Sequence, residues 1–355
     1  MTQIPVPVEI PVEIDDLTPN WFAAVLGGDV RGATVIESHS GTTGRARIAL
    51  THDEPELPPS VFVKFAPFSA AQRAFVDEQG MGVAEARFYA EIAPDVPVAK
   101  PAAFHAAWDD ERRYVMVLED LELSGAAPIE SDRVDLSTVI DGVIDNFAAL
   151  HGAFHGSPRF AAGADLAWVA KRSRGYGAGG PPFVTMAVDA FGDELGDGFR
   201  EFADFYCRRA VDVASVIAEG THTLVHGDAH MGNMFAIGVA SGFYDWAVIG
   251  AAPGMRDVGY FLTNSVPTGL RRSEERRWLA RYCDGLARRG VTLTTDDAWE
   301  QYRLQALTGW VAAVCTAGMG SKWQPIEVAV RSTKRSITAV ADLDTIGAFA
   351  QRDVT

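Results

Sequence analysis

The chain has 355 residues, 48% of them hydrophobic and 22% charged, with a formal net charge of −16. These proportions are ordinary for a globular protein with a large core, and because no basic stripe stands out they argue against a nucleic-acid partner. A cationic substrate is compatible with the acidity, although solubility alone explains it equally well. Cys207, Cys283 and Cys315 are too few and too widely spaced for a disulfide framework, so a reducing cytoplasm is expected.

Neither a signal peptide nor a membrane partner is expected. Residues 1–16 lack the basic region and the continuous apolar core of a signal peptide. No run of about 18 apolar residues is present to span a bilayer. A chain of this length holds either two domains or one two-lobed fold.

The first third of the chain predicts a short helix at residues 17–26, capped by Asp16 or Thr18, and then a series of strands. The predicted strands are residues 33–37, 46–51, 61–65 and 113–118.

A glycine-rich turn, Ser-Gly-Thr-Thr-Gly, separates the first two of these strands. The backbone N–H groups of such a turn can fold over phosphate groups, and here they belong to Gly41, Thr42, Thr43 and Gly44. Glycine and threonine also form ordinary turns, so the turn by itself does not distinguish a phosphate-binding loop from an ordinary hairpin turn.

Lys64 lies in the alternating segment 61–65, where a lysine ordinarily points to solvent. The helix that follows places Glu85 on the apolar stripe of residues 85–92, at the spacing i, i+3, i+4, i+7. A carboxylate on that stripe is costly unless it is paired or reaches solvent at the stripe's edge. The sequence therefore predicts an ion pair between Lys64 and Glu85.

The rest of the chain reads as mostly helical. The predicted helices are residues 140–154, 199–217, 296–317 and 332–346. His151 lies on the apolar face of the first of them, where a hydrogen-bonded core histidine is expected. A loop containing Gly175–Pro182 interrupts the series, and it is either a lid over a substrate or a mobile connection.

The segment 224–245 contains the most specific pattern of candidate site residues in the chain. An apolar lead-in runs into His226-Gly227-Asp228, Asn233 follows five positions after Asp228, and a predicted hairpin ends at Asp245. If Val239 is the centre of that hairpin, Asn233 and Asp245 face each other at its open end.

These groups suit a divalent cation and a hydroxyl. Mg²⁺ prefers oxygen ligands, usually one or two protein groups together with phosphate oxygens, and Asn233 and Asp245 can supply them. Asp228 is then left to orient a substrate hydroxyl and accept its proton during phosphoryl transfer. The alternative is a solvated acidic turn without a catalytic role, and the full H-G-D-x-H-x-G-N spacing disfavours it.

His226–Asn233, HGDAHMGN, followed by YDW at 244–246, resembles the catalytic segment of the aminoglycoside phosphotransferase and choline kinase family. The resemblance extends from about Glu37 to Leu343, and the branch it most resembles is the ecdysteroid-kinase-like one. It implies an α+β, protein-kinase-like fold that uses ATP and Mg²⁺ on a small hydroxylated substrate. A nucleotide-binding lobe with an antiparallel sheet would occupy residues 1–121, and a mostly helical catalytic lobe residues 122–355.

The resemblance also implies roles for individual residues. Lys64 and Glu85 would form the ion pair that holds the α- and β-phosphates. Backbone groups at Glu119, Asp120 and Leu121 would meet the adenine edge.

Three further positions would support the catalytic loop. His226 and Asp257 would brace its backbone, although an aspartate at the start of a helix is also common. His230 stands where protein kinases have lysine, so it either contacts the γ-phosphate or packs.

Two other functional classes stay open. A nucleotide-binding pseudokinase is disfavoured by the complete set of Lys64, Glu85, Asp228, Asn233 and Asp245. A protein kinase is disfavoured because Trp-Ala, rather than Phe-Gly, follows the last aspartate.

Overall fold

The computed structural model describes residues 9–172, 177–320 and 325–354. The chain divides into two compact units. Unit 1 comprises Met1–Val96, Lys100–Ala127 and Asp245–Val248, and unit 2 comprises Pro97–Ala99, Pro128–Tyr244 and Ile249–Thr355. A short strand, β6 (Ala127–Pro128), contains one of the points at which the chain passes between them.

Unit 1 is built on an antiparallel five-stranded sheet in the order β1-β2-β3-β5-β4. Its strands are β1 (Gly32–Ser40), β2 (Gly44–Thr51), β3 (Ser60–Phe65), β4 (Ala103–Trp108) and β5 (Tyr114–Glu119). The sequence predicts four of these strands and misses β4, whose alanine-rich sequence AFHAAW gives little strand signal.

One face of this sheet forms a hydrophobic core with α1 (Pro19–Leu26). The side chains of Val61, Val63 and Phe65 alternate onto that face and are fully buried. Thr18 caps the helix, because its hydroxyl oxygen accepts the N–H of Trp21 at 3.2 Å. Of the two caps predicted from the sequence, Thr18 is therefore the one that forms.

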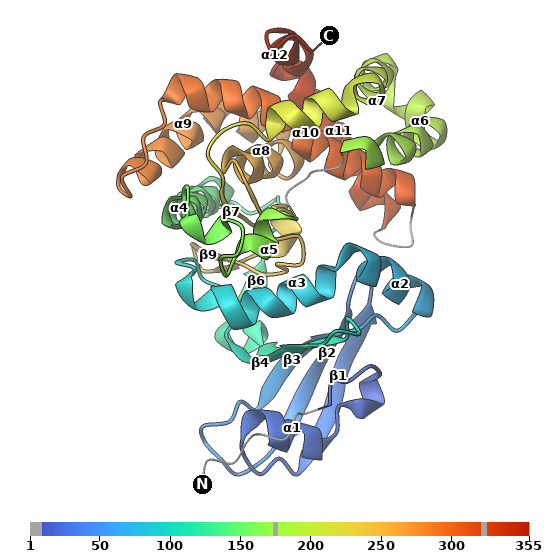
Figure 1. Cartoon of the computed structure of the whole chain (residues 1–355), viewed down its shortest axis with the longest axis vertical. Helices are drawn as coiled ribbons and strands as arrows, with labels where there is room; N and C mark the ends of the chain where they lie inside the picture. The colour runs from blue at the N-terminus through green and yellow to red at the C-terminus, as the bar shows by residue number, and fades with distance from the viewer. Residues whose placement is uncertain (1–8, 173–176, 321–324, 355) are drawn as a thin grey trace. The chain divides into compact units, whose positions relative to one another are not determined.

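Helix α3 covers the other face of the sheet, as Figure 1 shows, and α2 packs against α3. These helices are α2 (Ala70–Gln79) and α3 (Met81–Arg87), and α3 continues into a π-helical turn (Phe88–Ile92). The predicted apolar stripe is confirmed, because Glu85 and the aromatic residues of the π-helical turn are buried. Such turns occur frequently at functional sites.

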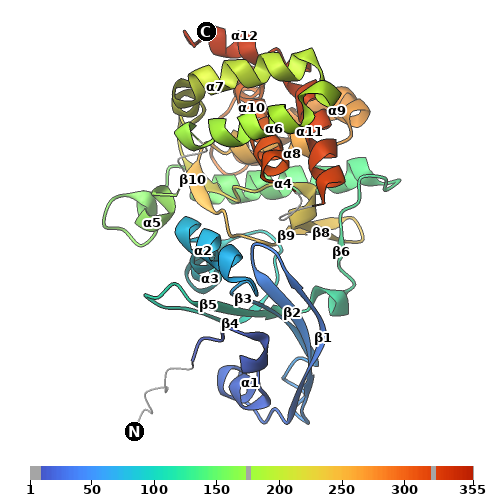
Figure 2. The ribbon, with the colours of Figure 1, turned by 90° about the vertical axis from the view of Figure 1, so that its right-hand side faces the viewer.

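Unit 2 is mostly helical. Its helices are α4 (Leu136–Phe154), α5 (Ala167–Ala170), α6 (Pro181–Leu195), α7 (Asp197–Ile217), α8 (Met255–Asn264), α9 (Thr268–Ala287), α10 (Thr295–Met319), α11 (Ile326–Asp342) and α12 (Thr345–Ala350). Figure 2 shows α10 packed among α6, α8 and α11. Trp310 of α10 is fully buried against Phe202 and Tyr206 of α7.

Unit 2 also contains four short strands that flank its loops. They are β7 (Thr223–Val225), β8 (Met234–Ile237), β9 (Ala240–Phe243) and β10 (Gly250–Ala252). β7 pairs with β10, and β8 and β9 form an antiparallel hairpin.

Two predictions for this unit are wrong in detail. The loop predicted before residue 199 contains helix α6, whose first two positions are Pro181 and Pro182. Proline is tolerated in the first turn of a helix because the N–H groups there have no partner within the helix. The helix predicted at 332–346 begins earlier, at Ile326, and ends at Asp342 before α12 starts.

Within the described ranges, no helix combines the length and the apolar character needed to cross a bilayer. The three cysteines have no disulfide partner.

Candidate active site

The predicted catalytic loop lies between β7 and β8 in unit 2. β7 ends at Val225, and the chain then turns through His226-Gly227-Asp228 into a short 3₁₀-helix, Met231–Asn233. Pairing of β7 with β10 fixes the start of this loop, and the hairpin of β8 and β9 fixes its end.

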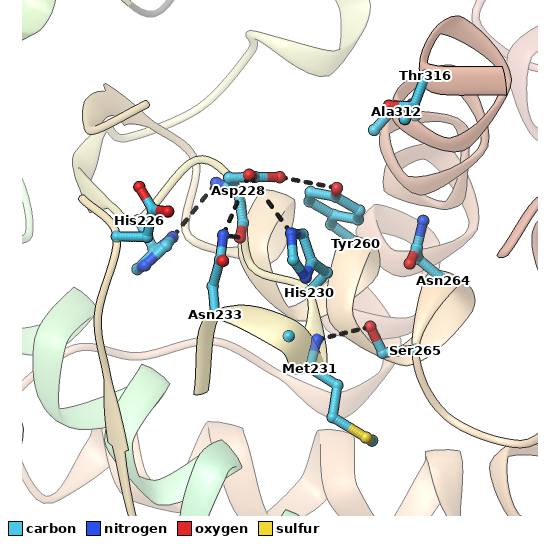
Figure 3. A network of polar contacts seen from close by, with 12 residues as sticks. His226, Asp228, His230, Met231, Asn233, Tyr260, Asn264, Ser265, Ala312 and Thr316 are labelled. Atoms are coloured by element: carbon cyan, nitrogen blue, oxygen red, sulfur yellow. Dashed lines mark hydrogen bonds and ion pairs between the residues drawn. The ribbon is translucent and has the colours of Figure 1, made fainter. Parts of the chain in front are cut away.

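Three side chains surround the carboxylate of Asp228 (Figure 3). The amide of Asn233 donates to the backbone oxygen of Asp228 at 3.0 Å and to its Oδ2 at 3.1 Å. The hydroxyl of Tyr260, on α8, donates to Oδ1 at 2.8 Å. The Nε2 of His230 lies 3.5 Å from Oδ2. The side chain of Asp228 is nevertheless 34% exposed, so the carboxylate is held in place and still accessible.

These contacts determine the charge state of Asp228. Burial by itself would raise the pKa of Asp228. The charge of His230, its hydrogen bond to the carboxylate and the hydrogen bond from Tyr260 instead lower that pKa well below its usual range. The carboxyl group of Asp228 is therefore ionised at neutral pH and is able to accept a proton.

Asp257 braces the backbone of the same loop. Its carboxylate accepts the N–H of His226 at 2.6 Å and the N–H of Gly227 at 3.0 Å. His151 is hydrogen-bonded and buried, as expected, since its Nε2 lies 3.3 Å from Asp257 and its Nδ1 2.9 Å from the hydroxyl of Tyr282. Burial opposes ionisation, but the hydrogen bond and charge of His151 outweigh it and lower the pKa of Asp257.

We expect Asp257→Asn to destabilise unit 2 by about 3 kcal/mol at pH 7, because two buried N–H groups lose a charged acceptor. The folded-state pKa of Asp257 is lowered, so its contribution is present above about pH 4 and declines as the pH falls further. The difference in free energy of unfolding between parent and variant should therefore shrink in acid, as urea titrations at several pH values would measure.

Asp165 offers a matched control for this substitution. It forms an exposed ion pair with Arg159, so Asp165→Asn should change stability little at any pH. If Asp257→Asn were equally harmless at pH 7, the brace would have no energetic role.

His226 connects the catalytic loop to the end of the hairpin. Its Nδ1 accepts the N–H of Asp228 at 3.3 Å, so its Nε2 carries the proton and donates to the carbonyl of Tyr244 at 3.0 Å. His226 is 1% exposed, so its side chain lies within the core of the loop.

The predicted hairpin register is wrong by one residue. Ile237 pairs with Ala240, which leaves Gly238 and Val239 as a two-residue loop. Gly238 has φ 60°, and a positive φ at the first loop position favours glycine. The N–H of Tyr244 consequently donates to the carbonyl of Asn233 at 3.1 Å, so Tyr244 and not Asp245 lies across from Asn233. Asp245 is the next residue along the chain and belongs to unit 1.

A second cluster of charged residues lies within unit 1. The Nζ of Lys64 is 2.5 Å from Oε2 of Glu85 and 3.1 Å from Oδ1 of Asp245. The predicted Lys64–Glu85 ion pair therefore forms, and the side chains of these two residues are 5% and 0% exposed. The sequence predicts Asp245 as a metal ligand and does not predict its contact with Lys64.

Glu85 also holds the segment that carries Asp245. Its Oε1 accepts the N–H of Trp246 at 3.2 Å, and the ring of Trp246 stacks on Phe88 with centroids 4.1 Å apart. Burial and the nearby charge of Asp245 raise the pKa of Glu85, while Lys64 opposes that effect. The Trp-Ala sequence that differs from protein kinases thus has a packing role.

If the chain binds MgATP, as the sequence resemblance implies, Lys64→Ala and Glu85→Ala should weaken that binding non-additively, because each substitution leaves the other charge buried and misplaced. Titration calorimetry on both single variants and the double variant would measure the coupling. A double variant whose loss equals the sum of the single losses would mean that the ion pair does not act as a unit.

Asp245 has a left-handed backbone conformation, with φ 64°. Residues other than glycine rarely adopt this conformation, although aspartate and asparagine tolerate it better than most. Strained backbone of this kind often occurs at functional sites.

The predicted adenine-contacting residues use their side chains within unit 1. Glu119 Oε2 accepts the N–H of Ala102 at 3.1 Å, and Asp120 accepts the hydroxyl of Ser60 at 2.5 Å. Leu121 begins a 3₁₀-helix that the Asp120 side chain caps. Some backbone groups of this segment are also engaged, since the N–H of Glu119 donates to Ala102 and the carbonyls of Asp120 and Leu121 accept the N–H groups of Leu123 and Ala126.

The glycine-rich turn closes the hairpin of β1 and β2. Ser40 pairs with Gly44 at its base, and the N–H of Gly41 donates to the carbonyl of Thr43 at 3.0 Å. Gly44 has a packing reason to be glycine, since a Cβ there would lie 2.4 Å from the carbonyl oxygen of Ala66.

The structure describes the predicted loop Gly175–Pro182 only in part, and the last two residues of that loop begin α6. His230 is 31% exposed and reaches Asp228.

Sequence reasoning missed Tyr260 as a site residue. Tyr260 follows Asp257 by three positions on α8, and residues three apart share a helix face. That spacing is a signal that could have placed its hydroxyl near the loop which Asp257 braces.

Among the residues that the structure describes, no group of three or more His, Cys, Asp and Glu side chains could hold a metal ion. Mg²⁺ does not require such a group when phosphate oxygens complete its ligands. Asn233 fits a ligand role, because its amide nitrogen is bound to Asp228 and its amide oxygen is left for a cation.

Known structures resemble the fold of this chain. A choline kinase from Cryptosporidium parvum has 11% identity and a TM-score of 0.57, over 95% of this chain and 96% of its own. Choline kinase LicA from Streptococcus pneumoniae has 14% identity and a TM-score of 0.52, over 93% and 99%. Aminoglycoside 2′-phosphotransferase-IIIa, whose structure is a GDP complex, has 12% identity and a TM-score of 0.51, over 87% and 93%.

These likenesses confirm the predicted kinase-like α+β fold. The narrower resemblance to the ecdysteroid-kinase-like branch is not confirmed, and no curated protein sequence matches the chain. The model of the phosphotransferase enzyme family matches residues 36–292, which is most of the sequence. The chain therefore belongs to the phosphotransferase enzyme family.

Proposed function

We propose that the protein transfers the γ-phosphoryl group of ATP, in the presence of Mg²⁺, to a hydroxyl group of a small molecule. The observation that carries this proposal is the carboxylate of Asp228. It is ionised, accessible and held by Asn233 and Tyr260 at the end of β7. Family membership supports phosphoryl transfer, and the site supports a hydroxyl acceptor.

Asp228 is the proposed base. Its carboxylate accepts the proton of the acceptor hydroxyl as the acceptor oxygen bonds to the γ-phosphorus. The bond from that phosphorus to the β,γ-bridging oxygen breaks, and ADP leaves with the bonding electrons. Tyr260 and Asn233 keep the carboxylate oriented during this transfer.

The nucleotide would be held by residues of unit 1. Lys64, oriented by Glu85, is the proposed contact for the α- and β-phosphates. The turn at residues 41–44 would cover the phosphates, and the backbone of residues 119–121 would meet the adenine.

Asn233 and Asp245 are the proposed ligands of Mg²⁺. When bound, Mg²⁺ supplies positive charge that stabilises the phosphate oxygens as negative charge develops on them. His230, beside Asp228, is the proposed contact for the transferred group.

A small hydroxylated acceptor suits the structural neighbours, whose names include choline kinases and an aminoglycoside phosphotransferase. The free cysteines support a reducing, cytoplasmic location. A protein kinase and a nucleotide-binding pseudokinase are the competing proposals.

A screen of acceptors separates the three proposals. The parent protein is incubated with MgATP and a library of hydroxylated metabolites, antibiotics and sterols, with protein substrates included, and ADP release is measured. Release that depends on a small molecule supports our proposal. Release with proteins alone favours a protein kinase. MgATP binding without transfer to any acceptor favours a pseudokinase.

A further inference from the structure

Arg45 lies on the same face of the unit 1 sheet as Lys64. The two residues are directly paired in neighbouring strands β2 and β3, so their side chains leave the sheet on one side. The residues that flank them in the sequence, Ala46 and Val63, point the other way into the hydrophobic core.

Arg45 differs from Lys64 and Arg47, which lie on the same face, because no described residue supplies it with a counter-charge. Lys64 contacts Glu85 and Asp245, and Arg47 forms ion pairs with Glu37 and Glu122. Among the described residues Arg45 forms no ion pair, and its Nε is buried without a hydrogen-bond partner.

This arrangement carries an energetic cost. Like charges directly opposite each other on paired strands are destabilising, and so is a buried donor without an acceptor. An unsatisfied buried group in a folded protein calls for an explanation, such as a ligand that completes it. An anion placed between Arg45 and Lys64 would remove both costs.

The glycine-rich turn adds a second unpartnered donor nearby. A Cβ at Gly41 would lie 3.6 Å from Nη2 of Arg45, so the guanidinium lies alongside the turn. Thr43 in that turn is 1% exposed, and its hydroxyl has no hydrogen-bond partner among the described residues. Ser40 anchors the base of the turn by accepting the N–H of Phe68 at 3.0 Å.

We propose that Arg45, together with the hydroxyl of Thr43, binds the phosphate chain of the nucleotide as a second cationic contact beside Lys64. A guanidinium presents its N–H groups in a planar fork that matches two phosphate oxygens, which an ammonium group cannot do. This inference rests on the proposed function, because it concerns the nucleotide of the same reaction.

Titration calorimetry on the full-length protein tests the inference with MgATP and with adenosine, which lacks phosphates. Arg45→Gln should weaken MgATP binding by about 10- to 100-fold, the range expected for losing a hydrogen bond to a charged group. It should leave adenosine binding unchanged. Thr43→Val, which keeps the shape of the side chain, should weaken MgATP binding by a smaller factor of about 3- to 10-fold.

Arg47→Gln is the matched control, since Arg47 lies on the same strand and face but already has two glutamate partners. It should change MgATP affinity by less than about twofold. Melting curves without ligand would establish that all three variants fold.

The outcomes separate this inference from the function on which it rests. If the parent binds MgATP and Arg45→Gln binds it equally well, the inference is wrong and the proposed function stands. If Arg45→Gln weakens MgATP and adenosine alike, Arg45 supports the fold of the site and not the phosphates. If the parent binds no nucleotide, the proposed function fails first.

Discussion

Replacing Asp228 with asparagine is expected to reduce phosphate transfer to a confirmed acceptor by about 10²–10⁴-fold, which corresponds to roughly 3–5 kcal/mol of barrier. Asparagine keeps the shape and polarity of the side chain but cannot accept the proton of the hydroxyl. The MgATP-induced rise in melting temperature should survive, because ligand stabilisation depends on binding and not on chemistry.

Tyr260→Phe is the matched control for this prediction. It removes the donor to Oδ1 of Asp228 but leaves the carboxylate in place, so its loss of transfer should be much smaller. Equal losses in the two variants would show that the hydrogen-bond network matters and the base does not. Transfer by Asp228→Asn at the parent rate would exclude Asp228 as the base.

Replacing Asp245 with alanine is expected to abolish Mg²⁺-dependent ATP turnover, because the proposed metal site loses its carboxylate. The same substitution also disturbs Lys64, which is 3.1 Å from Asp245. ADP release measured over a range of Mg²⁺ concentrations would test this, and turnover that is undiminished at all of them would remove Asp245 from the site.

The backbone at Asp245 makes alanine an imperfect probe. Alanine at φ 64° costs about 1 kcal/mol or more of strain, whereas asparagine tolerates that conformation. Asp245→Asn therefore isolates the loss of charge and should still lose turnover. Asp353, which is exposed and has φ 60°, provides a control in which Asp353→Ala adds similar strain elsewhere and should leave turnover intact.

Periodicity predicted the parts of the fold in which one face of an element is buried. The alternation at residues 61–65 identified a strand with a core face, and the stripe at 85–92 identified a buried carboxylate. The Lys64–Glu85 pair followed from the cost of leaving that carboxylate alone. These inferences worked because burial constrains the sequence strongly at each position.

Features that depend on local geometry could not be predicted in the same way. The register of the β8–β9 hairpin depends on which two residues form the turn, and choosing three instead of two shifted Asp245 by one position. The two prolines that open α6 are equally compatible with a loop. The contact between Tyr260 and Asp228 joins residues 32 positions apart, and the spacing of Tyr260 from Asp257 on α8 indicates only the helix face, not the hydrogen bond itself.

The most direct test follows the γ-phosphoryl group itself. ATP labelled at the γ-phosphate is incubated with Mg²⁺, the parent protein and an acceptor identified by ADP release, and the products are separated by mass. We expect the label to appear in a phosphate ester of the small molecule with the parent protein and to be nearly absent from that ester with Asp228→Asn. Label found only in inorganic phosphate, or in an ester formed equally well by both proteins, would contradict phosphoryl transfer with Asp228 as the base.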